Sequence, residues 1–142
     1  MATPQFESPA EFREVIDKTF QIMDTDPDMG PRLRDADVPQ RFEFTDVDLV
    51  LNVRAAHPDE DGNLHWEWSD DVDWQPKVKM SMSSETANKY FQGRENIAMA
   101  IARRRIKTGG DVKAALALIP ITKPLYDRYR DMVAADYPHL VA

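Results

Sequence analysis

Cysteine is absent from the 142-residue chain. Its absence excludes disulfide bonds, thiolate nucleophiles and cysteine-based zinc sites, and it is typical of a reducing compartment. No apolar run approaches the ~18 residues of a membrane span. Residues 1–12 show no basic segment followed by an apolar stretch, the pattern of a secretory signal. We therefore expect a soluble, cytoplasmic protein folded as one domain over residues 1–142.

Catalytic motifs are also missing. The sequence contains no nucleophile elbow, phosphate loop or dinucleotide fingerprint. The histidines are His57, His65 and His139. His65 shares one face of a predicted strand with a second candidate metal ligand, Glu67, and no third ligand is evident. The acidic loop at 59–62 lacks the ligand spacing of a calcium loop. We expect neither a metal ion nor another cofactor.

Charge is distributed unevenly along the chain. Residues 1–76 carry 6 basic and 19 acidic side chains, whereas residues 77–130 carry 12 basic and 4 acidic ones. The two parts could complement each other within the fold, or the basic part could face an anionic membrane surface or an acidic partner. The formal net charge of −7 disfavours nucleic-acid binding.

The first half of the chain predicts one helix followed by strands. Ser8, Pro9 and Glu11 are typical of a helix start. An apolar stripe at helical spacing follows them: Phe12, Val15, Ile16, Thr19, Phe20 and Met23. Residues 27–39 contain three prolines and a glycine, which predicts turns with at most a short helix at 32–35. Alternating apolar and polar residues then predict strands at 41–45, 49–54, 64–68 and 77–83.

The second half predicts mainly helices. Helix starts are expected after Ser83 or Ser84, after Asn96 and at Asp111. A fifth strand is expected at 106–108, followed by a tight turn at 109–111, and a last helix after Pro124 that Pro138 ends. This order predicts an α+β domain with a five-stranded, largely antiparallel sheet covered on one face by helices.

The apolar face of this sheet is the most informative feature for function. Trp66, Trp68, Met80 and Met82 fall on neighbouring predicted strands, and the helices expected to face them carry mostly alanines. Large flexible side chains opposite small ones can form an ordinary packed core. They can also enclose an apolar cavity for ligands of variable shape. The pattern alone leaves both interpretations open.

Residues 93–116, GRENIAMAIARRRIKTGGDVKAAL, resemble the sterol carrier protein-2 (SCP-2) family of lipid-binding domains. Gly93 matches the glycine that closes one helix in that family, Ala100 matches an alanine of the next helix, and Ile106 matches the apolar strand position. Gly110-Asp111 matches the Gly-Asp pair that opens the following helix, which continues with Ala115-Leu116. Arg104 departs from the family, which often has glycine just before the basic strand.

The resemblance implies an apolar tunnel between sheet and helices that holds a sterol, fatty acid or acyl-CoA without acting on it chemically. On that basis we predict a non-enzymatic lipid carrier whose ligand is an apolar small molecule, with a membrane surface or an enzyme as a transient partner. The predicted lining residues are Trp66, Trp68, Met80, Met82, Phe91, Ile97, Ile101 and Leu116, with Ile119, Ile121, Leu125 and Met132 as a C-terminal cover. Pro120 and Pro124 make that cover a plausible hinged segment.

Two other functions remain open at this stage. The protein could be a small enzyme that uses Asp71, Asp73 or His65 as acid or base, although these residues fall in an exposed-looking acidic stretch. It could also be an accessory module that docks on a lipid-metabolising enzyme. A helix-grip fold is the structural competitor, and the helix after Ser8 and the strand at 106–108 argue against it.

Overall fold

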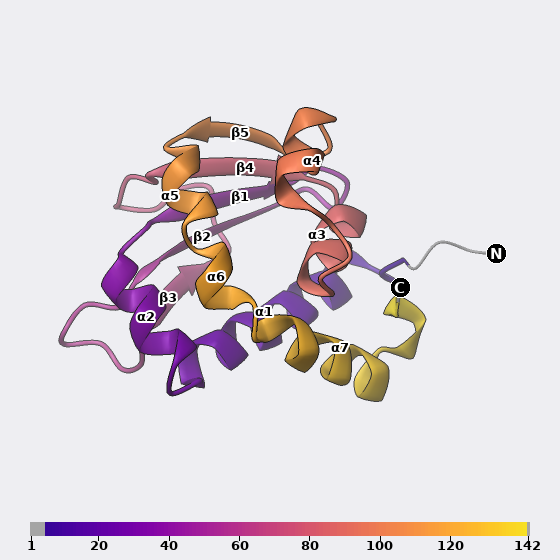
Figure 1. Cartoon of the computed structure of the whole chain (residues 1–142), viewed down its shortest axis with the longest axis horizontal. Helices are drawn as coiled ribbons and strands as arrows, with labels where there is room; N and C mark the ends of the chain where they lie inside the picture. Colours follow the sequence, from indigo (N-terminus) through magenta and orange to yellow (C-terminus); the bar gives the residue numbers. More distant parts are fainter. Residues whose placement is uncertain (1–4, 142) are drawn as a thin grey trace.

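A five-stranded sheet forms one layer of the molecule, and helices cover one of its faces (Figure 1). The computed structural model describes residues 5–141, so residues 1–4 and 142 of the expected domain lie outside the described part. The strands are β1 Gln40–Phe44, β2 Leu49–Ala55, β3 Leu64–Glu67, β4 Val78–Met82 and β5 Lys107–Gly110, in the order β3-β2-β1-β4-β5. All neighbouring pairs are antiparallel except β1 and β4. The predicted fold class is confirmed.

Strand register gathers the large apolar side chains on the face that the helices cover. Phe42 pairs with Leu51 on one side and with Met80 on the other, and Phe44 pairs with Met82. Directly paired residues project to the same side of a sheet, so these side chains form one continuous apolar surface. Trp66, paired with Val53, extends this surface toward β3.

Helix α1, Pro9–Thr25, starts as its sequence predicts and buries the predicted stripe. The Ser8 hydroxyl accepts a hydrogen bond from the Glu11 N–H at 3.1 Å. The six residues of the stripe are the buried residues of the helix. In Figure 1, α1 runs along the bottom of the molecule, beside α7, Leu125–Asp136.

Helix α2, Met29–Ala36, is longer than the sequence indicated. The Asp26 carboxylate accepts hydrogen bonds from the N–H groups of Asp28 and Met29, both at 2.8 Å, and so organises the first turn. Pro31 falls in that turn, where a helix does not need the missing N–H. Burial of Met29 and Leu33 against the core stabilises the helix, a tertiary contribution that local proline content cannot reveal.

The remaining helices are mostly short. They are α3 Ser84–Phe91, α4 Ile97–Ala102, α5 Val112–Leu116, α6 Ile119–Thr122 and a 3₁₀ turn at Pro138–Leu140. The predicted caps of α3, α4 and α5 are confirmed at Ser83, Asn96 and Asp111. No helix within residues 5–141 is long and apolar enough to cross a membrane.

The expected turn at 109–111 is wrong in part, because β5 includes Gly109 and Gly110. Gly110 pairs with Val78 on β4 and has a φ of +80°. A Cβ there would lie 2.5 Å from the Lys77 carbonyl oxygen, so only glycine lets the two backbones pair this closely.

Candidate ligand-binding cavity

An apolar cavity lies between the covered face of the sheet and the helices, with most of its helical lining from α3 to α6 and with Phe20, Met23 and Leu33 from α1 and α2. Its volume is about 90 Å³, and it is partly open to solvent. An apolar cavity of roughly 150 Å³ can bind a molecule as small as benzene. The space is therefore narrow as it stands, and a lipid would have to widen it by moving the side chains around it.

The sheet side of the cavity consists of aromatic and methionine side chains. Phe42 and Phe44 line it from β1, and Met80 and Met82 line it from β4. Met80 and Met82 are 8% and 6% exposed, so the sheet side is shielded from solvent. Unbranched methionine side chains adopt many shapes at little cost, which suits a wall that must adapt to a guest.

The helix side combines slender and small side chains. Ile97 and Ile101, one turn apart on α4, line the cavity together with Ala115 and Leu116 from α5. Helix α5 contains no buried residue, so it covers the cavity without filling it. Leu116 lines the cavity and is also 36% exposed, which places it at the rim.

Seven of the twelve residues predicted as lining lie around this cavity. They are Met80, Met82, Phe91, Ile97, Ile101, Leu116 and Ile119. A role for them in holding a ligand stays a prediction.

Trp66 and Trp68 do not line the cavity, although they lie on the covered face of the sheet. Both indole N–H groups donate to Oδ1 of Asp17 on α1, at 3.1 and 2.6 Å. The rings pack against α1, with Trp66 5.7 Å from the Phe20 ring and Trp68 6.4 Å from the Phe12 ring. The acceptor on α1 fixes both indoles beside the cavity, not inside it.

Most of the predicted C-terminal cover also lies outside the cavity lining. Leu125 is fully buried in the core, and Ile121 and Met132 pack against that core. The α7 residue Tyr129 donates a 2.7 Å hydrogen bond to Oδ1 of Asn88 on α3. This buried bond helps to hold α7 on α3, so only the segment up to Thr122 reaches the cavity.

Several lining residues are not among those predicted from the sequence, including Phe42, Phe44 and Thr108. Alternation within residues 41–45 placed the two phenylalanines on one face of the predicted strand, so the sequence did contain a signal that they belong to the apolar face. Their position next to Met80 and Met82 depends on the parallel pairing of β1 with β4, which bridges strands far apart in the sequence. Local periodicity contains no information about that pairing.

Tyr90 is a polar group in the helix wall of the cavity. Burial raises the pKa of its phenol above the ordinary value, and the neighbouring Tyr126 raises it further. The phenol is therefore neutral at physiological pH. A neutral hydroxyl, with the nearby Thr122, offers hydrogen bonds without adding charge to the wall.

The residues considered for acid–base chemistry lie elsewhere. Asp71 and Asp73 are exposed, and neither lines the cavity. His65 lies between two carboxylates, with ring nitrogens 3.6 Å from Glu60 and 3.5 Å from Glu67, and its ring contacts Trp74. These groups form a surface cluster that does not reach the apolar space.

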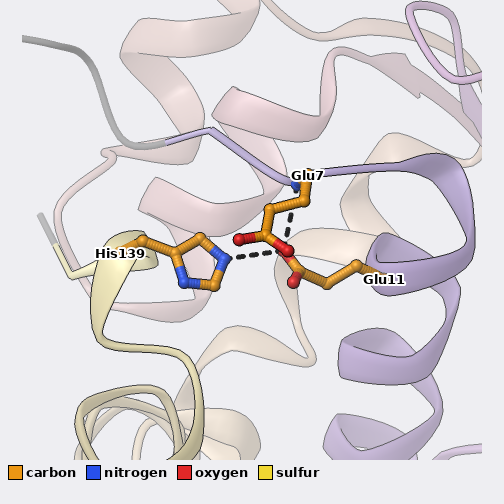
Figure 2. Close-up of side chains that lie close together, drawn as sticks. All are labelled: Glu7, Glu11 and His139. Carbon is orange, nitrogen blue, oxygen red and sulfur yellow. Dashed lines mark hydrogen bonds and ion pairs between the residues drawn. The ribbon is translucent and has the colours of Figure 1, made fainter.

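Glu7, Glu11 and His139 form a separate polar cluster, drawn in Figure 2. Their candidate ligand atoms lie within 4.8 Å of one another, the spacing of a metal-binding group. The cluster also has a structural explanation, because Oε1 of Glu11 accepts from the Glu7 N–H at 3.1 Å and lies 2.8 Å from Nε2 of His139. These contacts connect the start of α1 to the C-terminal 3₁₀ turn.

Comparison with solved structures identifies similar folds. One is a UbiJ-SCP2 ubiquinone synthesis protein, with a TM-score of 0.60 and 9% identity over 85% of this chain and 95% of that chain. Another is sterol carrier protein 2 from Yarrowia lipolytica in its apo form, with a TM-score of 0.56 and 11% identity over 89% of this chain and 99% of that one.

A third similar structure is a much larger protein. The sec-alkylsulfatase Pisa1 from Pseudomonas has a TM-score of 0.55 and 15% identity over 68% of this chain. The match covers only 16% of the alkylsulfatase chain, so the protein corresponds to one module of it.

Sequence comparison gives the family directly. No curated protein sequence matches the chain. A family model does match, that of the SCP-2 sterol transfer family over residues 20–123, which extends from the middle of α1 to the end of the cavity-lining segment. The match and the fold agree with the resemblance in residues 93–116, and the chain belongs to the SCP-2 sterol transfer family.

Proposed function

We propose that the protein binds and transfers an elongated apolar molecule, a sterol, fatty acid or acyl-CoA, in the cavity between the sheet and α3 to α6. The observation that carries the proposal is an apolar, partly open hollow in a domain of the SCP-2 sterol transfer family. Burial of an apolar guest contributes about 25 cal/mol per Å² of surface removed from water. This driving force is strong and unspecific, which suits a carrier of several lipids.

The narrow cavity opens by displacement of its helical cover. Helices α5 and α6 contain only five and four residues, and Pro120 and Pro124 lie at the starts of α6 and α7, where the segment changes direction between short helices. A guest entering beside Leu116 would push this segment outward and move the Met80 and Met82 side chains. The neutral hydroxyls of Tyr90 and Thr108 line the cavity and would orient a polar end of the guest.

The composition of the lining favours binding over catalysis. Among the described residues, the lining includes no aspartate, glutamate, histidine or lysine. Arg54 is the one permanent charge among them, and its guanidinium is engaged by both carboxylate oxygens of Glu60 at 2.6 and 3.1 Å. Such a wall supplies no obvious proton donor or acceptor for acid–base chemistry on a bound lipid.

A titration with a fluorescent fatty acid tests the proposal. Trp66 and Trp68 lie beside the cavity, so energy transfer from them reports entry of the probe, and we expect saturable transfer. Ala115→Phe places a ring in the cavity and should weaken binding at least tenfold. Ala134→Phe on the exposed side of α7 is the matched control and should leave binding unchanged. Absence of a saturable signal with fatty acid, acyl-CoA and sterol probes would refute the proposal.

A second candidate function is an accessory module that presents an apolar substrate to an enzyme. The comparisons favour it, because one similar structure is a ubiquinone synthesis protein and another is a module-sized part of an alkylsulfatase. Salt-sensitive co-purification with a catalytic partner, together with lipid binding, would support this role. Lipid delivery between vesicles by the purified protein alone would favour the independent carrier.

A further inference from the structure

Basic side chains are concentrated in the segment that forms α4, β5, α5 and α6. Residues 94–123 contain seven basic and two acidic side chains. Both acidic residues already have basic partners, since Glu95 pairs with Arg105 and Asp111 lies 4.0 Å from Lys77. The other six basic residues of the segment form no salt bridge within residues 5–141; they are Arg94, Arg103, Arg104, Lys107, Lys113 and Lys123. All six are exposed.

Exposed apolar side chains occur on the same elements, α4 and α5. The described part of the chain has three exposed large hydrophobic residues, and two of them are Met99 on α4, 44% exposed, and Leu116 on α5, 36% exposed. Leu116 also marks the rim of the cavity. Exposed apolar residues framed by cations are the combination that binds at the boundary between lipid headgroups and acyl chains.

The backbone of Arg104 adopts a conformation that is strained for a residue with a side chain. Its φ is 61°, in the left-handed region, which costs an ordinary residue free energy that glycine avoids. The two other non-glycine residues with positive φ in the described chain are aspartates, a residue type that tolerates this region. A strained arginine that makes no ion pair in the fold is consistent with a partner outside the fold.

Acidic side chains predominate at the opposite end of the molecule. Residues 1–76, with 19 acidic and 6 basic side chains, supply α1, α2 and the hairpin of β2 and β3. In Figure 1, α1 and α2 lie at the bottom while α4, α5 and β5 lie at the top. An anionic surface would attract the upper end and repel the lower one, which orients the cavity rim toward it.

We infer that the α4–β5–α5 surface docks on an anionic lipid bilayer, with Met99 and Leu116 entering the headgroup region and Arg103, Arg104 and their basic neighbours contacting lipid phosphates. Docking would serve the proposed function, because the bilayer would supply or receive the guest through the rim at Leu116. In this respect the inference rests on that function. Docking itself requires no guest, so the two can be tested with separate readouts.

Vesicle flotation tests the surface directly. The full chain is mixed with vesicles of phosphatidylcholine alone or with one quarter phosphatidylglycerol. We expect binding to the anionic vesicles only, and its loss at about 0.5 M salt, where charges are screened within a few ångströms. Each basic side chain near an anionic surface contributes roughly fivefold in partitioning. Arg103→Gln with Arg104→Asn should therefore lower binding about 25-fold.

The control removes the same number of charges elsewhere. Arg32→Gln with Arg34→Gln on α2 should change vesicle binding less than twofold. Equal losses in both double variants, equal binding to neutral vesicles, or no binding of the unmodified chain would overturn the inference. Salt-sensitive self-association that the Arg103/Arg104 variant abolishes, without vesicle binding, would also overturn it and identify a second copy as the partner.

Fatty-acid titration in solution separates this inference from the proposed function. The Arg103/Arg104 variant should bind the fluorescent fatty acid as the unmodified chain does, because neither arginine lines the cavity. A chain that docks on anionic vesicles but never takes up any of the three probe classes would retain the docking surface and lose the carrier function.

Discussion

The α1 side and the α4–α6 side of the molecule cover the same sheet in different ways. Helix α1 buries six side chains in 17 residues, whereas α4 buries only Ala100 and α5 buries none. The α1 side is filled by aromatic rings, with Phe12 4.6 Å from Phe44 between ring centroids. The α4–α6 side leaves a cavity, to which α1 contributes only Phe20 and Met23 near its C-terminal end. Helix length and side-chain size therefore decide where the interior is solid and where it is hollow.

Polar contacts strengthen the same contrast. On the α1 side, Asp17 accepts from two indoles, and Asp24 accepts from the N–H groups of Asn63 and Leu64 at 2.6 and 2.8 Å. These bonds connect α1 to β3 and the hairpin loop before it. Helices α4 and α5 have capping bonds at Asn96 and Asp111, which stabilise each helix locally. The cover can therefore move more easily than α1.

Truncation of a large side chain should distinguish the two sides most strongly. Phe12→Ala removes a fully buried ring and should lower the free energy of unfolding by about 4 kcal/mol. Leu116→Ala, at the rim of the cavity, should lower it by less than about 1 kcal/mol. Urea unfolding followed by circular dichroism measures both. Similar losses for the two variants would contradict the contrast between a filled and a hollow side.

Removal of the shared indole acceptor should have the next largest effect. Asp17→Ala leaves two indole N–H groups without their acceptor and should cost about 2 kcal/mol of unfolding free energy. Asp17→Asn retains one oxygen acceptor and should cost less. Tryptophan fluorescence during urea unfolding reports both stability and indole environment. A wild-type midpoint in the alanine variant would show that Asp17 does not hold the tryptophans on α1.

Relief of backbone strain on the α4–α6 side should have a smaller effect of opposite sign. Arg104→Gly should raise the free energy of unfolding by about 1 kcal/mol, because glycine adopts a positive φ without strain. The neighbouring Arg103 has a φ of −92°, so Arg103→Gly removes the same charge without relieving strain and should destabilise slightly. Thermal unfolding compares them. Stabilisation by both substitutions would point to charge repulsion as the cause.

The smallest effect concerns the hairpin loop after β2. The Arg54 guanidinium and the His57 N–H lower the pKa of Glu60 from 4.5 to about 2. The carboxylate therefore stabilises the fold above pH 4.5, and this contribution is lost as the pH falls toward 2. Glu60→Gln should lower the urea midpoint at pH 7 but not near pH 2. Asp61→Asn in the same loop is the control, and an equal pH dependence in both variants would disprove this role of Glu60.

Local patterns in the sequence predicted much of the fold. The start of α1, its six buried residues and the caps of α3, α4 and α5 follow from residues within one helical turn of each other. Alternation located the strands for a similar reason. Residues 93–116 indicated the family, and the match over residues 20–123 confirmed it.

Contacts between distant residues account for what the sequence did not predict. Trp66 and Trp68 shared a face with Met80 and Met82, yet the Asp17 acceptor 49 and 51 residues away holds them against α1. The parallel pairing of β1 with β4 put Phe42 and Phe44 in the cavity wall. Helix α2 formed because Met29 and Leu33 find a core to pack on. Local periodicity does not identify the partners in these contacts, because each partner lies far away in the sequence.

A crystal structure of the protein incubated with a long-chain fatty acid would show where the guest binds. We expect continuous electron density for the acyl chain between Met80, Met82 and Ile101, with the α5–α6 segment displaced outward. Density bound only at the outer surface, with the hollow closed by the protein's own side chains, would contradict this expectation.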